Sequence, residues 1–255
     1  MGKTRFDFAG QVVAITGAGK GIGGGAAIAF AEAGARVFAI DHTAVTGETT
    51  AKTIRDAGGD ATFIHCDVAD SRSVASVFQQ IDREAGRLDV LVNSAGGFSK
   101  QLTTDETPED EWDTVIDVNL KGVFLCAKHA IPFFKRQKSG RIVNLGSMAG
   151  LTTMAPASPP YAAAKAGVHA LTRVLAFELG KHGVTVNTVA PGTTASERVV
   201  ALRSPEQREA IGKSTLLGRI GEVDDMVGWV LFLAAPEASY LTGQTLAVNG
   251  GRLMV

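Results

Sequence analysis

The chain has 255 residues and a formal net charge of −1 at pH 7, with acidic and basic residues interspersed, so the basic footprint of a nucleic-acid-binding protein is missing. Hydrophobic residues make up 45% and aromatic residues 6%, so the core has to be built mainly from Ala, Val, Ile and Leu, which suits parallel strands buried on both faces. Cys66 and Cys126 are too few for a disulfide framework, and their apolar surroundings indicate buried free thiols.

The sequence shows no targeting or membrane-anchoring segment. The longest apolar run, Met226 to Ala235, is about half the length of a spanning helix and is typical of a core helix. The first residues, MGKTRFDF, include no apolar signal region, and the last residues, GRLMV, form neither a prenylation box nor a peroxisomal signal. We therefore expect a soluble cytoplasmic protein that does not bind membranes.

From Gln11 onward, short β-branched runs alternate with longer helical patterns. Strands are expected at 12–16, 36–41, 61–67, 89–96, 141–147, 184–192 and 245–251, and helices at about 21–34, before 58–59, and at 71–86, 108–136, 160–180 and 222–235. This alternation predicts an α/β fold with a Rossmann-type doubly wound parallel β-sheet of about seven strands flanked by helices. Because no linker composition interrupts the pattern, residues 1–255 are predicted to form a single domain.

Three connections are too long to be simple turns: 97–107, 148–160, and the segment from Pro191 to about 214. All three follow the carboxyl ends of strands, where open α/β sheets bind ligands. The segment 195–214 mixes apolar and charged residues and is predicted to be a mobile lid over the substrate, with a permanently packed surface helix as the alternative. The residues expected to contact the substrate indicate an apolar pocket of moderate size: Phe98, Met148, Met154, Pro156 and the segment 195–214.

Residues 16–25 read TGAGKGIGGG and join the first strand directly to the start of a helix. Two phosphate-loop patterns overlap there, G-x-G-x-x-G in GKGIGG and T-G-x-x-x-G-x-G in TGAGKGIG. In either pattern, glycine permits a tight turn close to a pyrophosphate, and the helix N-terminus offers free N–H groups. Gly24 and Gly25 disfavour a helix, and close helix–strand packing is the simplest reason for them.

Asp41 ends the second strand, where a carboxylate can bind the adenosine ribose hydroxyls and repel a 2′-phosphate. Lys20 in the glycine loop argues the other way, because a cation there could hold that phosphate. The carboxylate imposes the stronger penalty, so the sequence favours NAD over NADP. His42, next to Asp41, is either a contact to the adenosine side of the cofactor or a solvated loop residue.

Tyr161 and Lys165 are four residues apart in YAAAK and therefore project from one face of a helix. A lysine ammonium beside a phenol lowers the pKa of the tyrosine, which helps it to exchange a proton with an alcohol or ketone. Taken alone, this spacing is more often an ordinary surface pair.

The pair occurs here within an ordered series of motifs, and from about residue 7 to about 251 the chain resembles the short-chain dehydrogenases/reductases. The resemblance is strongest to single-domain members of about 250 residues, which include 3-oxoacyl-carrier-protein reductases and small secondary-alcohol dehydrogenases. The motifs that carry it are Thr16/Gly17/Gly21/Gly23, Asp67, Asn93-Ser94-Ala95-Gly96, Asn119, Ser147, Tyr161/Lys165 and Pro191-Gly192.

The resemblance implies four catalytic residues. Tyr161 is expected to be the general acid/base, and Lys165 to hold the nicotinamide ribose and lower the pKa of Tyr161. Ser147 is expected to hydrogen-bond the substrate oxygen. Asn119, in a predicted helix, is expected to hold a local kink and a water. Ser158 is an alternative to Ser147 for this role, but it lies at the start of a predicted helix and not at the end of a strand.

The resemblance also implies the residues that bind the cofactor. Asp67 and Val68 are expected at the adenine, and Thr194 and Ser196 at the nicotinamide carboxamide. No metal site is expected, because the histidines and cysteines lack ligand spacing. The full expected set is Gly17, Lys20, Gly21, Ile22, Gly23, Asp41, His42, Asp67, Val68, Asn93, Ala95, Gly96, Tyr161, Lys165, Pro191, Gly192, Thr194 and Ser196.

The sequence thus predicts an NAD(H)-dependent oxidoreductase that transfers a hydride between nicotinamide and a small-molecule secondary alcohol or ketone. One alternative is an NADPH-dependent 3-oxoacyl-carrier-protein reductase. Another is a non-catalytic cofactor-binding or scaffold protein, against which the complete set of four catalytic residues argues. The helix after Tyr161 is rich in small residues, and the resemblance implies that it packs against another subunit in a homotetramer.

Overall fold

The computed structural model describes residues 6–97, 101–152 and 158–254. Within these residues, seven parallel strands form one sheet in the order β3-β2-β1-β4-β5-β6-β7. The strands are β1 (Val12–Thr16), β2 (Arg36–Asp41), β3 (Asp60–His65), β4 (Val90–Asn93), β5 (Gly140–Leu145), β6 (Val184–Pro191) and β7 (Thr245–Val248).

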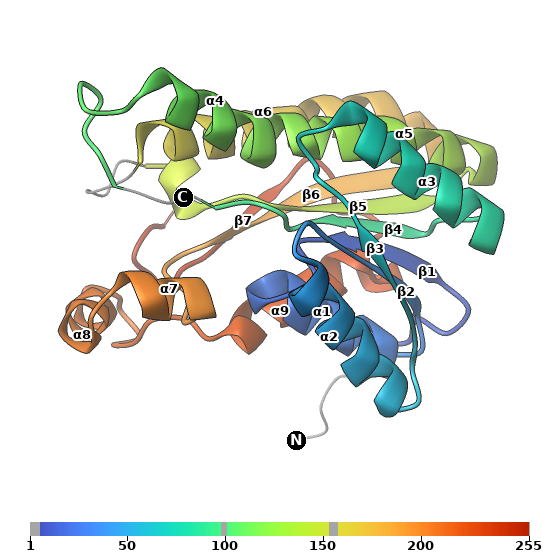
Figure 1. Ribbon diagram of the computed structural model, residues 1–255, viewed down its shortest axis with the longest axis horizontal. Helices are drawn as coiled ribbons and strands as arrows, with labels where there is room; N and C mark the ends of the chain where they lie inside the picture. Colours follow the sequence, from blue (N-terminus) through green and yellow to red (C-terminus); the bar gives the residue numbers. More distant parts are fainter. Residues whose placement is uncertain (1–5, 98–100, 153–157, 255) are drawn as a thin grey trace.

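Helices cover both faces of this sheet, and the predicted doubly wound fold is confirmed (Figure 1). Helices α3 to α6 lie on one face, and α1, α2 and α9 lie on the other. The helices are α1 (Gly21–Glu32), α2 (Ala44–Asp56), α3 (Ser71–Ala85), α4 (Glu109–Ile116), α5 (Gly122–Gln137), α6 (Pro159–Leu179), α7 (Glu197–Leu202), α8 (Pro205–Lys213) and α9 (Val223–Ala234).

The predicted strands are all present, and the differences lie at their ends. The fourth and seventh strands end at Asn93 and Val248, earlier than expected, because the chain turns away from the sheet at glycines with positive φ, among them Gly96 and Gly250. The long helix expected at 108–136 is α4 and α5 joined by a π-helical turn, Asp117–Lys121.

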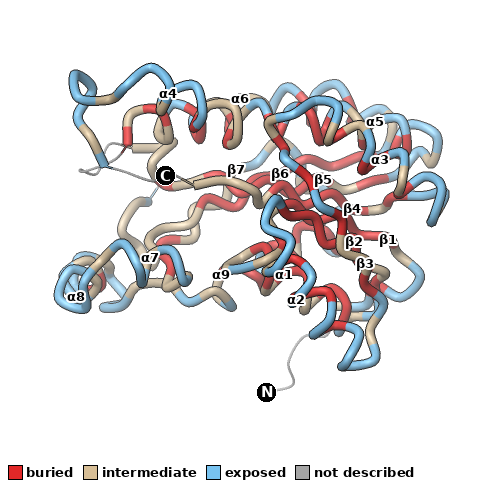
Figure 2. Tube along the Cα trace, in the orientation of Figure 1, coloured by how far each residue is buried: buried red, intermediate tan, exposed pale blue. Residues whose placement is uncertain are grey.

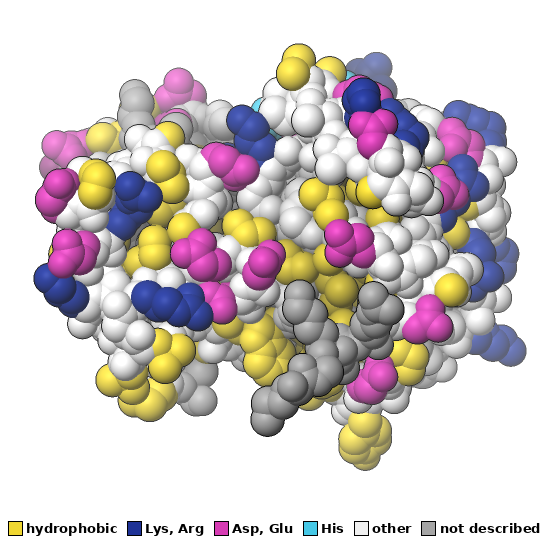
Figure 3. Space-filling model, turned by 90° about the horizontal axis from the view of Figure 1, so that it is seen from below, with side chains coloured by type: hydrophobic (Ala, Val, Ile, Leu, Met, Phe, Trp, Pro, Cys, Tyr) yellow, Lys and Arg dark blue, Asp and Glu magenta, His cyan; other side chains and the backbone are white. Residues whose placement is uncertain are grey.

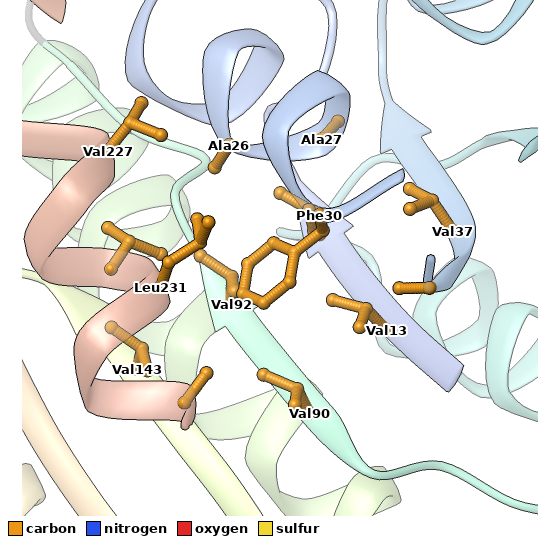
Figure 4. Close-up of a cluster of buried hydrophobic side chains, with 14 of the residues drawn as sticks. Val13, Ala26, Ala27, Phe30, Val37, Val90, Val92, Val143, Val227 and Leu231 are labelled. Atoms are coloured by element: carbon orange, nitrogen blue, oxygen red, sulfur yellow. The ribbon is translucent and has the colours of Figure 1, made fainter. Parts of the chain in front are cut away.

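The core consists of two apolar layers, one on each side of the sheet. The strands are buried along most of their length, and the helices bury the sides that face them (Figure 2). In the layer below the sheet, Phe30 of α1 lies among Val13, Val90 and Val92 of the strands and Leu231 of α9 (Figure 4). Burial of these side chains holds α1, and with it the glycine loop, against the sheet.

Gly25 has a different role from the one expected. A Cβ at Gly25 would lie 2.8 Å from Val223 Cγ1 and 3.1 Å from Val227 Cγ2, both on α9. The close approach is therefore between two helices and not between a helix and a strand. Gly24 does approach the loop after β1, because its Cβ would lie 3.3 Å from the Ala18 carbonyl oxygen.

A buried chain of polar side chains crosses the sheet and reaches α6. Asn93 donates to Asn144 at 2.9 Å, Asn144 donates to Thr172 at 2.8 Å, and the hydroxyls of Thr172 and Thr188 lie 2.7 Å apart. Because β4, β5, β6 and α6 each supply one of these residues, the network fixes the height of α6 on the sheet.

The segment beyond Pro191 is not a plain loop, since it contains α7 and α8. Helix α8 begins with a capping box formed by Ser204 and Gln207, which explains why the polar sequence becomes helical there. Both helices are largely exposed at one end of the molecule (Figure 2). The connections 97–107 and 148–160 lie only partly within the described residues.

The outer surface agrees with the balanced charge. Acidic and basic side chains are interspersed on the face seen in Figure 3, and no large area of one sign stands out there. Among the described residues, no helix combines the length and apolarity needed to span a membrane.

Candidate active site

A cavity of about 720 Å³ lies at the carboxyl ends of the strands. Its walls come from the glycine loop, the ends of β2, β5 and β6, the turn after β4, the start of α6, and the segment with α7 and α8. The carboxyl ends of a doubly wound sheet are the expected position for a ligand.

The glycine loop has the geometry of the T-G-x-x-x-G-x-G pattern. Gly17 and Gly21 have φ of +65° and +55°, which only glycine adopts readily. A Cβ at Gly23 would lie 2.2 Å from the Gly17 carbonyl oxygen, so no side chain fits there. The backbone therefore forms an open cradle before the N-terminus of α1, a shape that fits the pyrophosphate of a dinucleotide.

Asp41 lies at the end of β2 and faces the cavity. One carboxylate oxygen accepts the Gly19 N–H and the other accepts the Thr43 N–H, each at 2.8 Å. His42 Nδ1 lies 3.3 Å from Asp41, although the His42 ring is exposed. Lys20 lines the same side of the cavity and, among the described residues, forms no ion pair. A carboxylate and an ammonium group thus stand at the adenosine end.

The turn after β4 is tied to β1. The Thr16 hydroxyl accepts the N–H groups of Ser94 and Ala95, each at 3.1 Å, and a Cβ at Gly17 would lie 2.8 Å from Ala95. The resulting close packing joins the glycine loop and the turn into one wall of the cavity.

Asn119 lies in the π-helical turn and is completely buried. Its side chain accepts the Gly97 N–H at 2.8 Å and donates to the carbonyl oxygens of Gly97 at 2.8 Å and Val115 at 2.9 Å. A Cβ at Gly96 would lie 2.5 Å from the Asn119 amide oxygen and 3.3 Å from Lys165 Nζ. The irregular turn therefore brings an amide against a glycine pair beside Lys165, in agreement with the expected local distortion of the helix.

Ser147, Tyr161 and Lys165 meet at the floor of the cavity. The Ser147 side chain is close enough to lower the pKa of Tyr161 as a hydrogen-bonding group, and Lys165 Nζ lies 5.6 Å from the Tyr161 ring centroid. Lys165 is buried and donates to the Leu145 carbonyl oxygen at 2.8 Å, which fixes its ammonium group below the tyrosine. Ser158 also lines the cavity, but it is the residue that precedes the first turn of α6.

Burial dominates the electrostatics of this group. It lowers the pKa of Lys165 to about 8, with the Arg198 charge acting in the same direction. Burial raises the pKa of Tyr161, while the Ser147 hydrogen bond and the charge of Arg198 oppose the rise. Desolvation of the phenolate is the largest of these causes, so burial outweighs the contributions of Ser147 and Arg198 at Tyr161.

His169 lies one helical turn beyond Lys165 and was not anticipated from the sequence as part of the site. It is buried, and its Nε2 accepts the Ser147 N–H at 3.5 Å. A Cβ at Gly146 would lie 2.3 Å from the same nitrogen. Burial and the charges of Lys165 and Arg173 lower its pKa to about 4, so a neutral imidazole supports the end of β5 beneath Ser147.

The start of α7 reaches across the cavity to the glycine loop. Glu197 Oε2 accepts the Gly21 N–H at 3.2 Å, and Arg198 Nη1 donates to the Gly96 carbonyl oxygen at 2.9 Å. No sequence pattern indicates these contacts, because a charged pair in a polar segment usually faces solvent.

Most of the expected site residues line this one cavity: Gly17, Lys20, Gly21, Ile22, Asp41, His42, Gly96, Met148, Ser147, Tyr161, Lys165, Pro191, Gly192, Thr194 and Ser196. Four further expected residues are adjacent in sequence or contact to lining residues but do not line the cavity themselves: Gly23, Asn93, Ala95 and Asn119. Asp67 and Val68 do not line it: Asp67 is exposed and accepts the Ala69 N–H at 2.9 Å, whereas Val68 is buried against Gly122. Phe98, Met154 and Pro156 lie outside the described residues. Among the described residues, no cluster of His, Cys, Asp and Glu could hold a metal ion.

A family model described as enoyl-(acyl carrier protein) reductase matches residues 17–252. The structure superposes with a TM-score of 0.92 on a short-chain type dehydrogenase/reductase from Mycobacterium marinum, which is 33% identical, with 98% of each chain covered. The chain therefore belongs to the short-chain dehydrogenases/reductases, a family of oxidoreductases that bind a nicotinamide cofactor.

Two curated relatives show a similarity over nearly the whole chain. The short-chain reductase protein NovJ of Streptomyces niveus is 41% identical over 248 residues, which are 95% of this chain and 94% of the relative. The 3-oxoacyl-[acyl-carrier-protein] reductase FabG of Staphylococcus aureus is 41% identical over 242 residues, which are 94% of this chain and 97% of the relative.

Proposed function

We propose that the protein is an NAD(H)-dependent oxidoreductase that interconverts a secondary alcohol and a ketone. The observation that carries the proposal is that Ser147, Tyr161 and Lys165 line the same cavity, with the Lys165 ammonium group at the face of the tyrosine ring. A protein that merely binds a cofactor has no need of such a group.

The cradle of the glycine loop and the Gly96–Gly97 turn fit a nicotinamide dinucleotide, which supplies the hydride when bound. The chain's own residues position the substrate and move the proton. We expect the Ser147 hydroxyl to hydrogen-bond the substrate oxygen. In reduction, the Tyr161 hydroxyl donates its proton to that oxygen, and in oxidation the phenolate removes it. Lys165 stabilises the phenolate by its positive charge.

Asp41 supports NAD as the cofactor. Its carboxylate faces the cavity at the end of β2, and a 2′-phosphate close to it would be repelled. Thr194 and Ser196 line the opposite end and are proposed to contact the nicotinamide side. The segment 195–214 is proposed to act as a lid on a single catalytic domain of residues 1–255.

The second candidate is an NADPH-dependent 3-oxoacyl-carrier-protein reductase, which the 41% identity to FabG favours. Lys20 at the cavity wall is the residue that would favour NADPH. Comparison of kcat/KM with NADH and NADPH, using a 3-oxoacyl thioester and a set of simple ketones, separates the two candidates. A 2-enoyl thioester in the same set reports reduction of a carbon–carbon double bond.

We further propose a homotetramer, which the exposed apolar side chains of α5 and α6 support, and a cytoplasmic location, as expected from the sequence alone. Phe177 is 90% exposed and Val174 is 51% exposed on α6, and Phe124 is 47% exposed on α5. Exposed apolar side chains on adjacent helices are typical of an interface between copies.

The test is the substitution Tyr161→Phe, which removes only the hydroxyl. We expect turnover to fall by about 10²- to 10⁴-fold while the dissociation constant for NADH changes little, because the aromatic ring remains in place. Steady-state kinetics with a ketone substrate and a fluorescence titration with NADH measure the two quantities. Turnover close to that of the unmodified protein would show that Tyr161 is not the acid/base.

A further inference from the structure

Three arginines, Arg198, Arg203 and Arg252, line the cavity on the side that the lid segment and the C-terminal end of the chain form. Within the described part of the chain, none of them forms an ion pair. Of the other arginines in the described residues, five are paired with carboxylates, Arg36, Arg55, Arg87, Arg136 and Arg219, and five are not, but none of these ten lines the cavity. The sequence suggested an apolar pocket, so this concentration of unpaired positive charge is a property of the folded chain.

Arg198 lies beside the glycine pair that adjoins Lys165. Its Nη1 donates to the Gly96 carbonyl oxygen, and a Cβ at Gly97 would lie 0.9 Å from the same nitrogen. The guanidinium group therefore packs against the Gly96–Gly97 backbone, and a Cβ at Gly96 would lie 3.3 Å from Lys165 Nζ. The charge of Arg198 acts to lower the pKa of both Tyr161 and Lys165.

The acidic residues of the cavity do not balance this charge. Among the described lining residues, the carboxylates are Asp41 and Glu197. Asp41 binds the Gly19 and Thr43 N–H groups at the adenosine end, and Glu197 binds the Gly21 N–H in the glycine loop. Both are held by backbone groups, so the substrate end keeps an excess of positive charge.

We propose that the substrate carries a carboxylate a few bonds from the reacting carbon, and that Arg198 binds this carboxylate. A guanidinium group has five N–H donors and binds a carboxylate through two parallel hydrogen bonds. Arg198 uses one donor for Gly96 within the described residues, so the others are available to a ligand. Arg203 and Arg252 add positive charge to the same end. This inference rests on the proposed function and specifies its substrate class as oxo acids and hydroxy acids.

The test compares oxo acids with their methyl esters, which differ in charge but keep the reacting ketone. Pyruvate, 3-oxobutanoate and 4-oxopentanoate, each with its methyl ester and NADH, vary the distance between carboxylate and ketone. We expect kcat/KM for at least one acid to exceed that of its ester by about tenfold or more. If no acid exceeds its ester, the proposal is wrong.

Variants then assign the preference to Arg198. Arg198→Met should lower kcat/KM for the preferred acid by about 10- to 100-fold and that for its ester by less than about threefold, and Arg198→Lys should restore part of the loss. Arg83→Met is the matched control, because Arg83 is an exposed arginine on α3, outside both the cavity lining and the lid segment.

Three outcomes contradict the assignment of Arg198: equal losses with acid and ester, a raised KM for NADH at an unchanged acid-to-ester ratio, or an equal effect of Arg83→Met. The proposed function is judged separately, because Tyr161→Phe should remove activity with both the acid and the ester. If the parent protein turns over the esters but shows no preference for the acids, only the proposed substrate class is wrong. If Tyr161→Phe retains turnover, only the proposed mechanism is wrong.

Discussion

Asp41 combines two functions that can be separated by a single substitution. Its oxygens hold the Gly19 and Thr43 N–H groups, and its negative charge faces the cavity. In Asp41→Asn the charge is lost while the size is kept. We expect the ratio of kcat/KM for NADH to that for NADPH to fall by at least about tenfold, because the repulsion of a 2′-phosphate is removed.

Asp67→Asn is the control for this prediction, since Asp67 is an exposed aspartate outside the cavity lining. It should leave the cofactor ratio unchanged. A parent protein that prefers NADPH would show that Lys20 rather than Asp41 determines the cofactor.

His169 predicts a specific loss of stability in acid. Its pKa is lowered from 6.5 to about 4 by burial, Lys165 and Arg173, so between these values the unfolded chain binds a proton that the folded chain does not. The stability that neutral His169 contributes is present above pH 6.5 and is lost as the pH falls towards 4.

Urea denaturation of the parent and of His169→Leu, at pH 7 and at pH 5, measures this effect. Between the two pH values the parent should lose about 1–2 kcal/mol more than the variant. His65→Leu, at an exposed position, should behave as the parent does. Equal pH dependence in parent and His169→Leu would show that His169 is not kept neutral by the fold.

The π-helical turn between α4 and α5 is the element that the site depends on most. Asn119 lies within it and makes three hydrogen bonds to backbone groups of Gly97 and Val115. In Asn119→Ala these buried groups lose their partners. We expect the free energy of unfolding to fall by about 2–4 kcal/mol and kcat to fall by about 10- to 100-fold, because the glycine pair beside Lys165 is displaced.

Asn187→Ala separates the two effects. Asn187 is also a buried asparagine that bonds to backbone groups, of Leu241 and Gln244, but it does not line the cavity. It should lose stability and keep the kcat of the folded protein. If Asn119→Ala also keeps its kcat, the role of Asn119 is structural only.

Sequence patterns predict regular elements better than irregular ones. The runs VVAIT and RVFAID coincide with β1 and β2, because burial on both faces requires continuous apolar residues. The π-helical turn has no comparable sequence pattern. Whether a helix accommodates one extra residue in a turn depends on the tertiary contacts of its side chains. The same reason applies to Gly25, where only the neighbouring α9 explains the glycine.

At the scale of the whole molecule, the segment with α7 lies against the loop that we propose for the pyrophosphate. The Glu197 carboxylate accepts the Gly21 N–H, a group that the proposed cofactor would also use. Glu197→Gln weakens this competing contact by removing its charge at the N-terminus of α1. We expect the dissociation constant for NADH, measured by fluorescence titration, to fall about 2- to 5-fold.

Glu48→Gln is the matched control, because Glu48 pairs with Arg55 on α2 and lies outside both the cavity lining and the lid segment. It should leave NADH binding unchanged. Weaker NADH binding in Glu197→Gln would mean that Glu197 supports the bound state instead of competing with it.

The sequence by itself determined the doubly wound sheet, the family, and the positions of Tyr161, Lys165 and Ser147, because strand and helix periods and the YAAAK spacing are local properties of the chain. The tertiary structure decided what depends on residues far apart in the sequence. It brought Arg198 to Gly96, Glu197 to Gly21 and His169 beneath Ser147, and it excluded Asp67 and Val68 from the cavity lining. These contacts depend on the distances between elements that are far apart in the sequence. The packing of the helices on the sheet sets those distances, and a local sequence pattern does not contain them.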